Sequence, residues 1–299
     1  MSDKKQKSAV HKIIRIINSI VDNAMLLIFV FLLMVGCYSL WDTHTINQEA
    51  TQEEYQVYKP ELKDNRSFLD FQKVNPDVIG WVTIYGTKID YPLLQAEDND
   101  KYLNTAPDGS FALSGSIFLD YRNSPNFDDF NSIIYGHHME ARKMFGDIQK
   151  FKEREFFEKH RYGSLYFNGK IYGLEFGNFL EADAYDSFIF SPAVRDRLGY
   201  LNRIEILTTN RREIGLNETD QLVMLSTCAS MDTNGRHILV ARLMDEVPKD
   251  PFDKGIKKRA GQSALFGNDN LLRFLLLDAV LLIFVYLVYR KKKREDISE

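Results

Sequence analysis

The sequence predicts a mainly β protein built on an antiparallel or mixed barrel of seven to eight strands, with a transmembrane helix on each side of it. Three observations support this prediction. Short apolar runs typical of strands follow one another between residues 78 and 247, with turn residues between them. These runs do not alternate with helices as they do in a parallel α/β sheet. Two long apolar segments lie outside this region, and basic residues flank each of them on the side of the nearer terminus.

The composition of the 299 residues fits a folded domain and excludes some classes of protein. Hydrophobic residues make up 44% and aromatic residues 13%, which is enough to form a packed core. The net charge of −4 gives no reason to expect nucleic acid as a partner. No cluster of cysteine and histidine has the spacing of a zinc site, so we expect no structural metal, and nothing indicates a cofactor.

The first apolar segment, residues 23–41, predicts an uncleaved membrane anchor. As a helix its 19 residues span about 28 Å at ~1.5 Å per residue, close to the ~30 Å hydrocarbon core of a bilayer. Tyr38 and Trp41 suit the membrane interface. Residues 1–22 are basic and are therefore predicted to be cytoplasmic.

The second apolar segment, residues 271–289, predicts another membrane-spanning helix, which Asp278 interrupts. The basic tail that follows, residues 290–299, places the C-terminus in the cytoplasm as well. The region between the two helices is then extracytoplasmic. Residues 248–270 are the expected linker to the second helix.

The extracytoplasmic region begins with a polar segment, residues 42–77, in which we expect two short helices. Strand-like sequence starts at Val78, and two strands turn at Tyr85–Gly86–Thr87. A short helix or turn is expected at residues 98–104, and helical turns at residues 144–160. Further strands are predicted at residues 114–123 and 131–138.

The second half of the barrel has the clearest turn signal. Asn168–Gly169 predicts a hairpin between strands at residues 164–167 and 170–184. Ser191 and Pro192 suit the start of a helix over residues 191–203, followed by a strand at 204–209. The last two strands are predicted at residues 222–225 and 238–243, and the barrel domain covers residues 78–247.

Cys228 is the cysteine outside the membrane segments, because Cys37 lies within the first of them. It is compatible with a buried small side chain, an intermolecular disulfide or a reactive nucleophile. Small polar neighbours, among them Ser226 and Thr227, favour an exposed position at a strand end. A nearby cation would stabilise the thiolate that attacks carbonyl groups.

Histidine and arginine are the helpers that such a nucleophile needs, as a proton donor and as a donor to the oxyanion. His137 and His138 lie at the end of a predicted strand, after its apolar residues and a glycine, whereas His160 is expected to be a solvated surface residue. Arg236 begins the last strand, and the alternation of a strand places His237 on its opposite face. Arg242 lies about 20 Å further along at ~3.3 Å per residue, which favours Arg236.

Three segments together resemble the signature motifs of the sortases, membrane-anchored cysteine transpeptidases of Gram-positive bacteria. They are LSTC at residues 225–228, Arg236 followed by HILVA, and YGHHM at residues 135–139. The resemblance implies a closed sortase-type β-barrel, Cys228 as nucleophile, and His137 and Arg236 as its partners. It also implies that Ser226 and Thr227 bind substrate. Met224 departs from the TLxTC pattern at a position without chemical function.

The segments NPDVIGWVTIYGTKIDYPLLQ, DNDKYLN and GSIFLDYRN resemble the class B branch in particular. A second, C-terminal membrane helix is instead typical of the pilus-building class C. Its DPW- or DPF-type lid is absent before the barrel, since the DPF of residues 250–252 follows the last strand. The combination implies a class B catalytic domain with pilus-type anchoring.

The resemblance implies cleavage of a C-terminal sorting signal after Thr and transfer of the acyl group to an amine. The expected partners are sorting-signal-bearing surface proteins or pilins, a lysine or peptidoglycan amine as acceptor, and membrane lipid through two helices. Polymerisation of pilins is the first expectation, and anchoring of a surface protein to peptidoglycan is the alternative. A hydrolytic cysteine protease and a non-catalytic membrane-tethered scaffold are the other functions compatible with the sequence.

Overall fold

A computed structural model describes residues 2–50, 55–61, 64–139, 142–228 and 234–253 of the chain. The predicted second membrane helix, the basic tail and most of the linker lie outside these described residues. The chain divides into two units, residues 1–45 with 261–299, and residues 46–260. Each is considered by itself.

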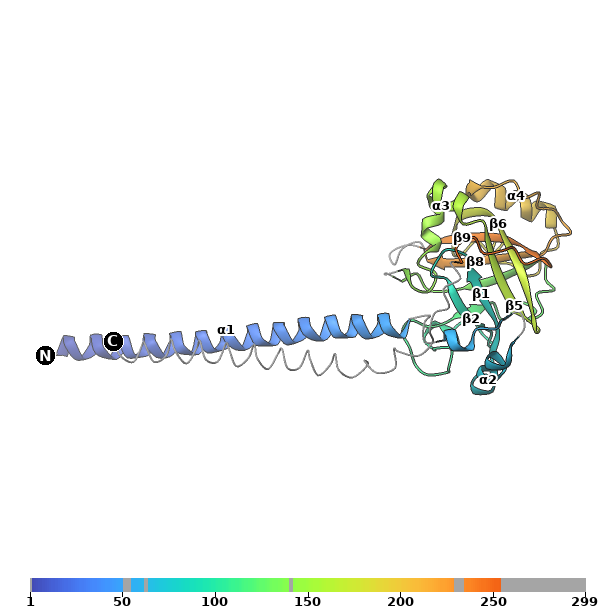
Figure 1. Cartoon of the computed structure of the whole chain (residues 1–299). Coiled ribbons are helices and arrows are strands. Elements are labelled where there is room, and N and C mark those ends of the chain that lie inside the picture. The colour runs from blue at the N-terminus through green and yellow to red at the C-terminus, as the bar shows by residue number, and fades with distance from the viewer. Residues whose placement is uncertain (1, 51–54, 62–63, 140–141, 229–233, 254–299) are drawn as a thin grey trace. The chain divides into compact units, whose positions relative to one another are not determined.

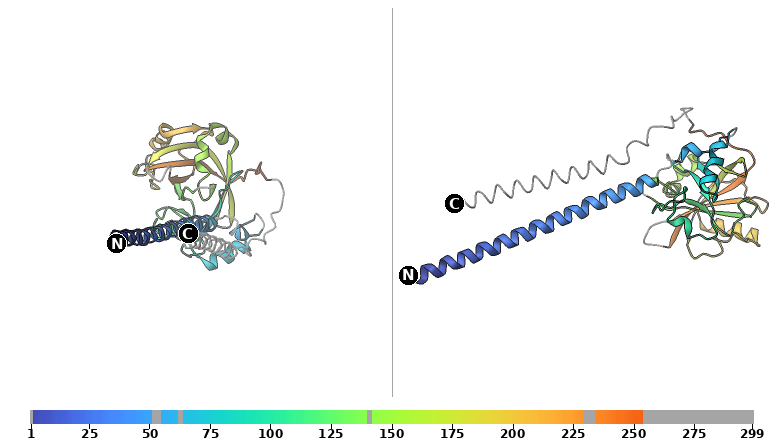
Figure 2. Two further views of the ribbon diagram at one scale, coloured as in Figure 1. Left: turned by 90° about the vertical axis from the view of Figure 1, so that its left-hand side faces the viewer. Right: turned by 90° about the horizontal axis from the view of Figure 1, so that it is seen from below.

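The N-terminal segment forms one continuous helix, α1 (Ser2–Glu49), as Figure 2 shows. Its segment Val10–Thr43 is long and apolar enough to cross a membrane, with a mean hydropathy of 2.4. The helix continues past the predicted end at Trp41 because neither glycine nor proline occurs between Gly36 and Pro60. Residues 42–49 of the predicted helical segment belong to α1, and the rest contains η2 (Gln56–Tyr58) before Pro60 and α2 (Arg66–Val74) after it.

Eight strands close into a barrel, which confirms the predicted fold class (Figure 1). Around the barrel their order is β5, β1, β2, β3, β4, β8, β9 and β6, and the β5–β6 pairing closes the ring. A ninth strand, β7, pairs with β6. The sheet is mixed, because β2–β3 and β4–β8 are parallel and the other pairs are antiparallel. The strands are β1 (Val78–Ile84), β2 (Asp90–Leu94), β3 (Ile117–Leu119), β4 (Asn131–Tyr135), β5 (Tyr162–Phe167), β6 (Lys170–Asp183), β7 (Thr208–Arg211), β8 (Leu222–Cys228) and β9 (Gly235–Met244).

The short helices between the strands fall where the sequence predicts them. They are η3 (Lys101–Leu103), η5 (Ile148–Lys152) and α3 (Arg154–Lys159). The Asn168–Gly169 turn also forms as predicted, with φ angles of 49° and 78° that match the left-handed residues of a tight hairpin.

Helix α4 (Arg197–Leu207) begins later than predicted, and the strand expected at residues 204–209 is helical as far as Leu207. Asp196 rather than Ser191 caps it, since its carboxylate accepts a hydrogen bond from the amide of Gly199 at 2.9 Å. Tyr200 and Ile204 lie one turn apart and are both buried against the outer face of the barrel. This packing stabilises helix rather than strand at residues 204–207.

Alternation along the strands separates an interior core from two outer layers. Val223, Leu225 and Leu239 belong to the cluster that fills the barrel. Their neighbours Met224 and Ile238 belong to the outer cluster beneath α4. The inner and outer faces of β8 and β9 are therefore both covered along most of their length.

Candidate active site

The three predicted catalytic residues lie at one end of three adjacent strands. Cys228 is the last residue of β8, and its partner across the antiparallel pair is Arg236, the second residue of β9. On the other side, β4 runs parallel to β8 with Tyr135 opposite Ser226, and the Gly136 amide donates to the Ser226 carbonyl at 3.2 Å. Continuing this register by two residues aligns His137 with Cys228.

The same register places these residues on one face of the sheet. Ser226 and Cys228 share the face of β8 that carries Met224, and Arg236 shares the face of β9 that carries Ile238. Both belong to the outer face. His237 lies on the inner face and packs against the Phe179 ring at 5.5 Å between centroids. The predicted division of Arg236 and His237 between opposite faces is confirmed.

The His137 ring is held by the backbone of a neighbouring segment. Its Nε2 lies 2.8 Å from the carbonyl oxygen of Leu103, in η3, so that Nε2–H donates and Nδ1 is left for other chemistry. The carbonyl of His137 accepts from the Phe145 amide at 3.0 Å. A side chain at Gly115, whose φ is 58°, would lie 2.6 Å from the Leu103 oxygen. Gly115 therefore permits the close approach that positions this carbonyl.

The loop after His137 and His138 contains two non-glycine residues with left-handed backbone, Arg142 at φ 67° and Met144 at φ 49°. The Met144 amide donates to the Tyr91 hydroxyl at 3.0 Å. Arg142 binds the fully buried carboxylate of Asp147 through two hydrogen bonds of 2.7 and 2.9 Å. Burial favours the neutral form of Asp147 and raises its pKa. The hydrogen bonds and the positive charge of Arg142 act in the opposite direction, and the pKa of Asp147 lies below its usual value.

The two arginines that compete for the oxyanion role have different surroundings. The Arg236 guanidinium is half-buried, and among the described residues its hydrogen bond goes to the adjacent Gly235 carbonyl at 3.2 Å. Arg242 is opposite Leu222, at the far end of β8, and donates to the buried Glu175 at 2.6 Å. Arg242 is therefore part of a structural ion pair, and Arg236 is the arginine at the Cys228 end.

Ser226 and Thr227, the predicted substrate-binding residues, are both buried, at 1% and 2% exposure. The exposure that the sequence predicts is that of Cys228, and it stays a prediction. Strand pairing on both sides of β8 and the two cores cover Ser226 and Thr227. Neither hydroxyl has a hydrogen-bond partner among the residues that the structure describes. Their role in binding stays a prediction.

A buried network beside the site was not recognised in the sequence. The Tyr135 hydroxyl donates to the buried carboxylate of Asp120 at 3.0 Å, and Arg122 binds that carboxylate with two hydrogen bonds. Arg122 also donates to the Phe190 carbonyl at 3.0 Å, which ties the segment before α4 to β4. Desolvation and the negative charge of Asp120 raise the pKa of Tyr135, so the phenol stays protonated. The clue in the sequence is the DYR tripeptide directly after β3.

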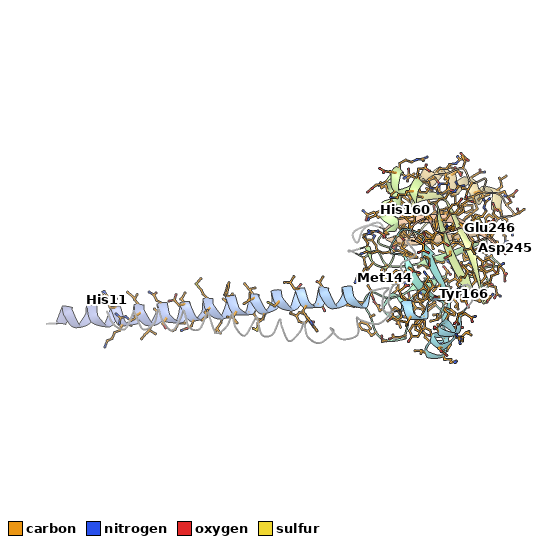
Figure 3. The ribbon with its side chains drawn as sticks, viewed as in Figure 1. His11, Met144, His160, Tyr166, Asp245 and Glu246 are labelled. Carbon is orange, nitrogen blue, oxygen red and sulfur yellow. The ribbon has the colours of Figure 1, made fainter. Side chains whose placement is uncertain are left out.

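His160 is buried at 5% exposure rather than solvated as expected. His160, labelled in Figure 3, lies at the end of α3. Its ring stacks between Phe156 and Phe252, at 3.8 and 4.9 Å between centroids. Burial lowers the pKa of His160. Phe252 belongs to the DPF segment after β9, so in the structure this segment covers His160. Within the described part of the chain, no group of three histidine, cysteine or acidic side chains is placed to hold a metal ion.

Comparison with known proteins agrees with this geometry. Residues 82–244 match the sortase domain family. Sortase B of Listeria monocytogenes is 35% identical over 179 residues, which cover 58% of this chain and 73% of that protein. Sortase B of Staphylococcus aureus is 28% identical over 206 residues and is matched over 84% of its length.

Solved structures give the same result. Sortase B from the type II pilus of Streptococcus pneumoniae is 47% identical, with a TM-score of 0.51, covering 58% of this chain and 97% of that one. A Streptococcus pyogenes class B sortase involved in pilus biogenesis is 38% identical, with a TM-score of 0.56 and coverage of 59% and 97%. Sortase B of Bacillus anthracis has a TM-score of 0.61 at 28% identity, with coverage of 69% and 100%. The chain belongs to the sortase family of cysteine transpeptidases, and its catalytic domain is of the class B type.

Proposed function

We propose that Cys228, His137 and Arg236 carry out the transpeptidation. The observation that supports this assignment is the register of β4, β8 and β9, which aligns the three residues on one face at one end of the sheet. In the first step the Cys228 thiolate attacks the carbonyl carbon of a Thr in the sorting signal. Arg236 donates hydrogen bonds to the oxyanion that forms.

The protonated His137 then gives a proton to the nitrogen of the leaving peptide. In the imidazolium both ring nitrogens carry hydrogen, so Nε2 keeps its bond to the Leu103 carbonyl while Nδ1 supplies the proton. The amide bond breaks and a thioester to Cys228 remains. An incoming amine attacks the thioester, His137 takes its proton, and the thiolate leaves as a new amide forms.

The proposed substrate is a pilin, and the proposed acceptor is a lysine side chain of the next pilin. Two of the similar structures support this choice, since one comes from a type II pilus and the other is described as involved in pilus biogenesis. They are also 47% and 38% identical to this chain, whereas the Staphylococcus aureus sortase B is 28% identical. Attachment of a surface protein to the amine of a peptidoglycan cross-bridge is the second candidate.

The acceptor decides between these two functions. The enzyme is incubated with a sorting-signal peptide and equal concentrations of a pilin domain and a peptidoglycan stem peptide, and the products are identified by mass spectrometry. We expect an isopeptide bond to a pilin lysine. Exclusive transfer to the stem peptide would establish the wall-anchoring function, and release of free acid at all amine concentrations would indicate a protease.

We further propose that the enzyme crosses the cell membrane twice, with the catalytic domain outside the cell and both termini in the cytoplasm. α1 contains an apolar segment of sufficient length, and the basic residues at both chain ends support this orientation. Tags at the two termini should both resist protease added to intact protoplasts. Digestion of the C-terminal tag would rule out the two-pass arrangement.

A further inference from the structure

Each proposed catalytic residue has a polar neighbour in the chain, and in β8 and β9 this neighbour lies on the opposite face of the sheet. His138 follows His137, Thr227 precedes Cys228, and His237 follows Arg236. Thr227 and His237 are directly opposite each other in the β8–β9 pair. His138 is close enough to His237 to influence its ionisation. A polar layer therefore lies inside the barrel directly behind the catalytic positions.

His237 is the most buried ionisable member of this layer. Its side chain is 7% exposed, and its Nε2 lies 3.4 Å from Oε1 of Glu181, its partner on β6. Glu181 in turn accepts a hydrogen bond of 2.8 Å from Lys152 of η5. The Nδ1 atoms of His138 and His237 and the Thr227 hydroxyl are buried without a hydrogen-bond partner among the described residues.

Arg236, in contrast, has little side-chain support on the outer face. The hydrogen bond found for its guanidinium within the described structure goes to the carbonyl of the preceding residue. The place of the guanidinium therefore depends on the backbone at the start of β9. His237 is the next residue along this backbone, and its ring is anchored between Phe179 and Glu181.

We propose that His237 is a positioning residue for the transpeptidation, which in its neutral form holds the start of β9 and thereby aims Arg236 at the oxyanion. This inference rests on the proposed function, since it assigns Arg236 the oxyanion role. His237 is paired with Thr227 and not with Cys228 in the β8–β9 register. Its effect is exerted through Arg236.

The charges around His237 determine when it is neutral. Burial lowers the pKa of His237, the negative charge of Glu181 opposes this shift, and the positive charges of Lys152 and His138 add to it. The facing groups are therefore Glu181 from β6, Lys152 from η5 and His138 after β4, while Thr227 from β8 carries no charge. A proton on His237 would add a cation beside Lys152 in a buried site. The start of β9 then shifts toward solvent, and turnover falls as the pH is lowered.

Two substitutions at the exposed end of this chain of contacts test the inference without disturbing the core. Glu181 and Lys152 are 42% and 58% exposed. Glu181→Gln removes the charge that favours protonation of His237, so the acid limb of the pH profile of kcat should move to lower pH by about 1 unit, roughly the effect of one charge in water at the 3.4 Å contact distance. Lys152→Met should move the limb in the opposite direction, to higher pH. KM for a sorting peptide should stay unchanged in both.

The matched control is Asp245→Asn, which breaks the exposed ion pair between Lys170 of β6 and Asp245, just beyond β9 (Figure 3). It should leave the profile unchanged. The measurements use the full chain in lipid vesicles and follow the His237 ring proton by NMR in parallel. In all variants the midpoint of the acid limb should follow the titration of His237.

His237→Asn separates a positioning role from a direct effect of charge on Cys228 or His137. We expect kcat to fall about tenfold. In this background Glu181→Gln and Lys152→Met should no longer move the acid limb. If they still move it, or if the limb does not follow the His237 titration in the folded single variants, the inference is wrong.

Should Cys228→Ala retain activity, the proposed function itself fails. Activity that requires Cys228 but is unchanged in His237→Asn would contradict the positioning role and leave the proposed function intact.

Discussion

At the scale of single residues, the main feature of the site is the alternation of side chains along its strands. This alternation separates a proposed catalytic residue from the polar residue next to it in the chain. In β8 and β9 the register places Cys228 and Arg236 on the outer face and Thr227 and His237 on the inner one. A strand requires this alternation. A shift of one residue in the register of β8 would exchange Cys228 for Thr227, so the strand pairing itself selects the nucleophile.

Substitution of the two neighbouring histidines should have very different effects. His137→Ala removes the proposed proton donor and should lower kcat by about 10²–10⁴-fold. His138→Ala removes a ring on the opposite face and should retain most of the turnover. Both are compared in a peptide-release assay with the melting temperature as a control for folding. Equal losses in two well-folded variants would contradict the assignment of His137.

Arg236→Ala should lower kcat by about 10²–10³-fold, since a single oxyanion donor contributes that much in other acyl-transfer enzymes. Arg242→Ala is the matched comparison. It breaks the contact with the buried Glu175 and should lower the melting temperature while leaving kcat of the folded fraction nearly unchanged. The reverse pattern would show that the wrong arginine was assigned.

Local sequence rules are sufficient to predict which strand residues belong to the site. They are insufficient to predict the loop residues that pack around it. Strand length alone favours Arg236 over Arg242, and alternation alone predicts His237 on the opposite face. The Leu103 carbonyl, Gly115 and Asp120 could not be predicted, because they reach the site only through tertiary packing of loops distant in sequence.

At the scale of elements, the β5–β6 hairpin closes the barrel. Its turn depends on the left-handed backbone of Asn168 and Gly169. Gly169→Val should destabilise the domain by about 1–2 kcal/mol, because a side chain at positive φ is strained even where the space is open. Asn168→Gly should be nearly neutral. Chemical denaturation measures both. Equal stability of the two variants would contradict the proposed role of the turn.

Helix α4 shows how a good local signal can be overruled. Ser191–Pro192 suits a helix start, yet Asp196 provides the cap, and burial of Tyr200 and Ile204 on the barrel extends the helix to Leu207. Capping preferences differ by only about 1 kcal/mol. Burial of two large side chains contributes more. Tertiary packing therefore determined where this helix begins and ends, and the sequence could predict only that a helix exists.

At the scale of the whole molecule, buried carboxylates make the stability of the barrel domain depend on pH. The pKa values of Asp120 and Asp147 lie below the usual value near 4, because their arginine partners outweigh the opposing effect of burial. The unfolded chain therefore binds more protons than the folded one as the pH falls below about 4. The stabilisation is complete above that pH and is lost as the pH falls through the lower, folded-state values.

The free energy of unfolding should consequently decrease steeply from about pH 4 downward. Asp147→Asn should lower stability at neutral pH and also reduce this slope, because the group that takes up the proton is gone. Denaturant titrations between pH 2.5 and 7 measure both effects. An unchanged slope in the variant would show that Asp147 does not contribute to the acid sensitivity.

The central claim is that Cys228 forms a thioester with the substrate and passes the acyl group to an amine. Intact-mass spectrometry of the full chain, mixed with a sorting-signal peptide, tests it directly. We expect an adduct of the N-terminal peptide fragment on Cys228 that is absent from Cys228→Ala. The adduct should disappear when an amine acceptor is added and yield the amide product. Peptide cleavage that persists in Cys228→Ala, or a Cys228 adduct that no amine resolves, would contradict it.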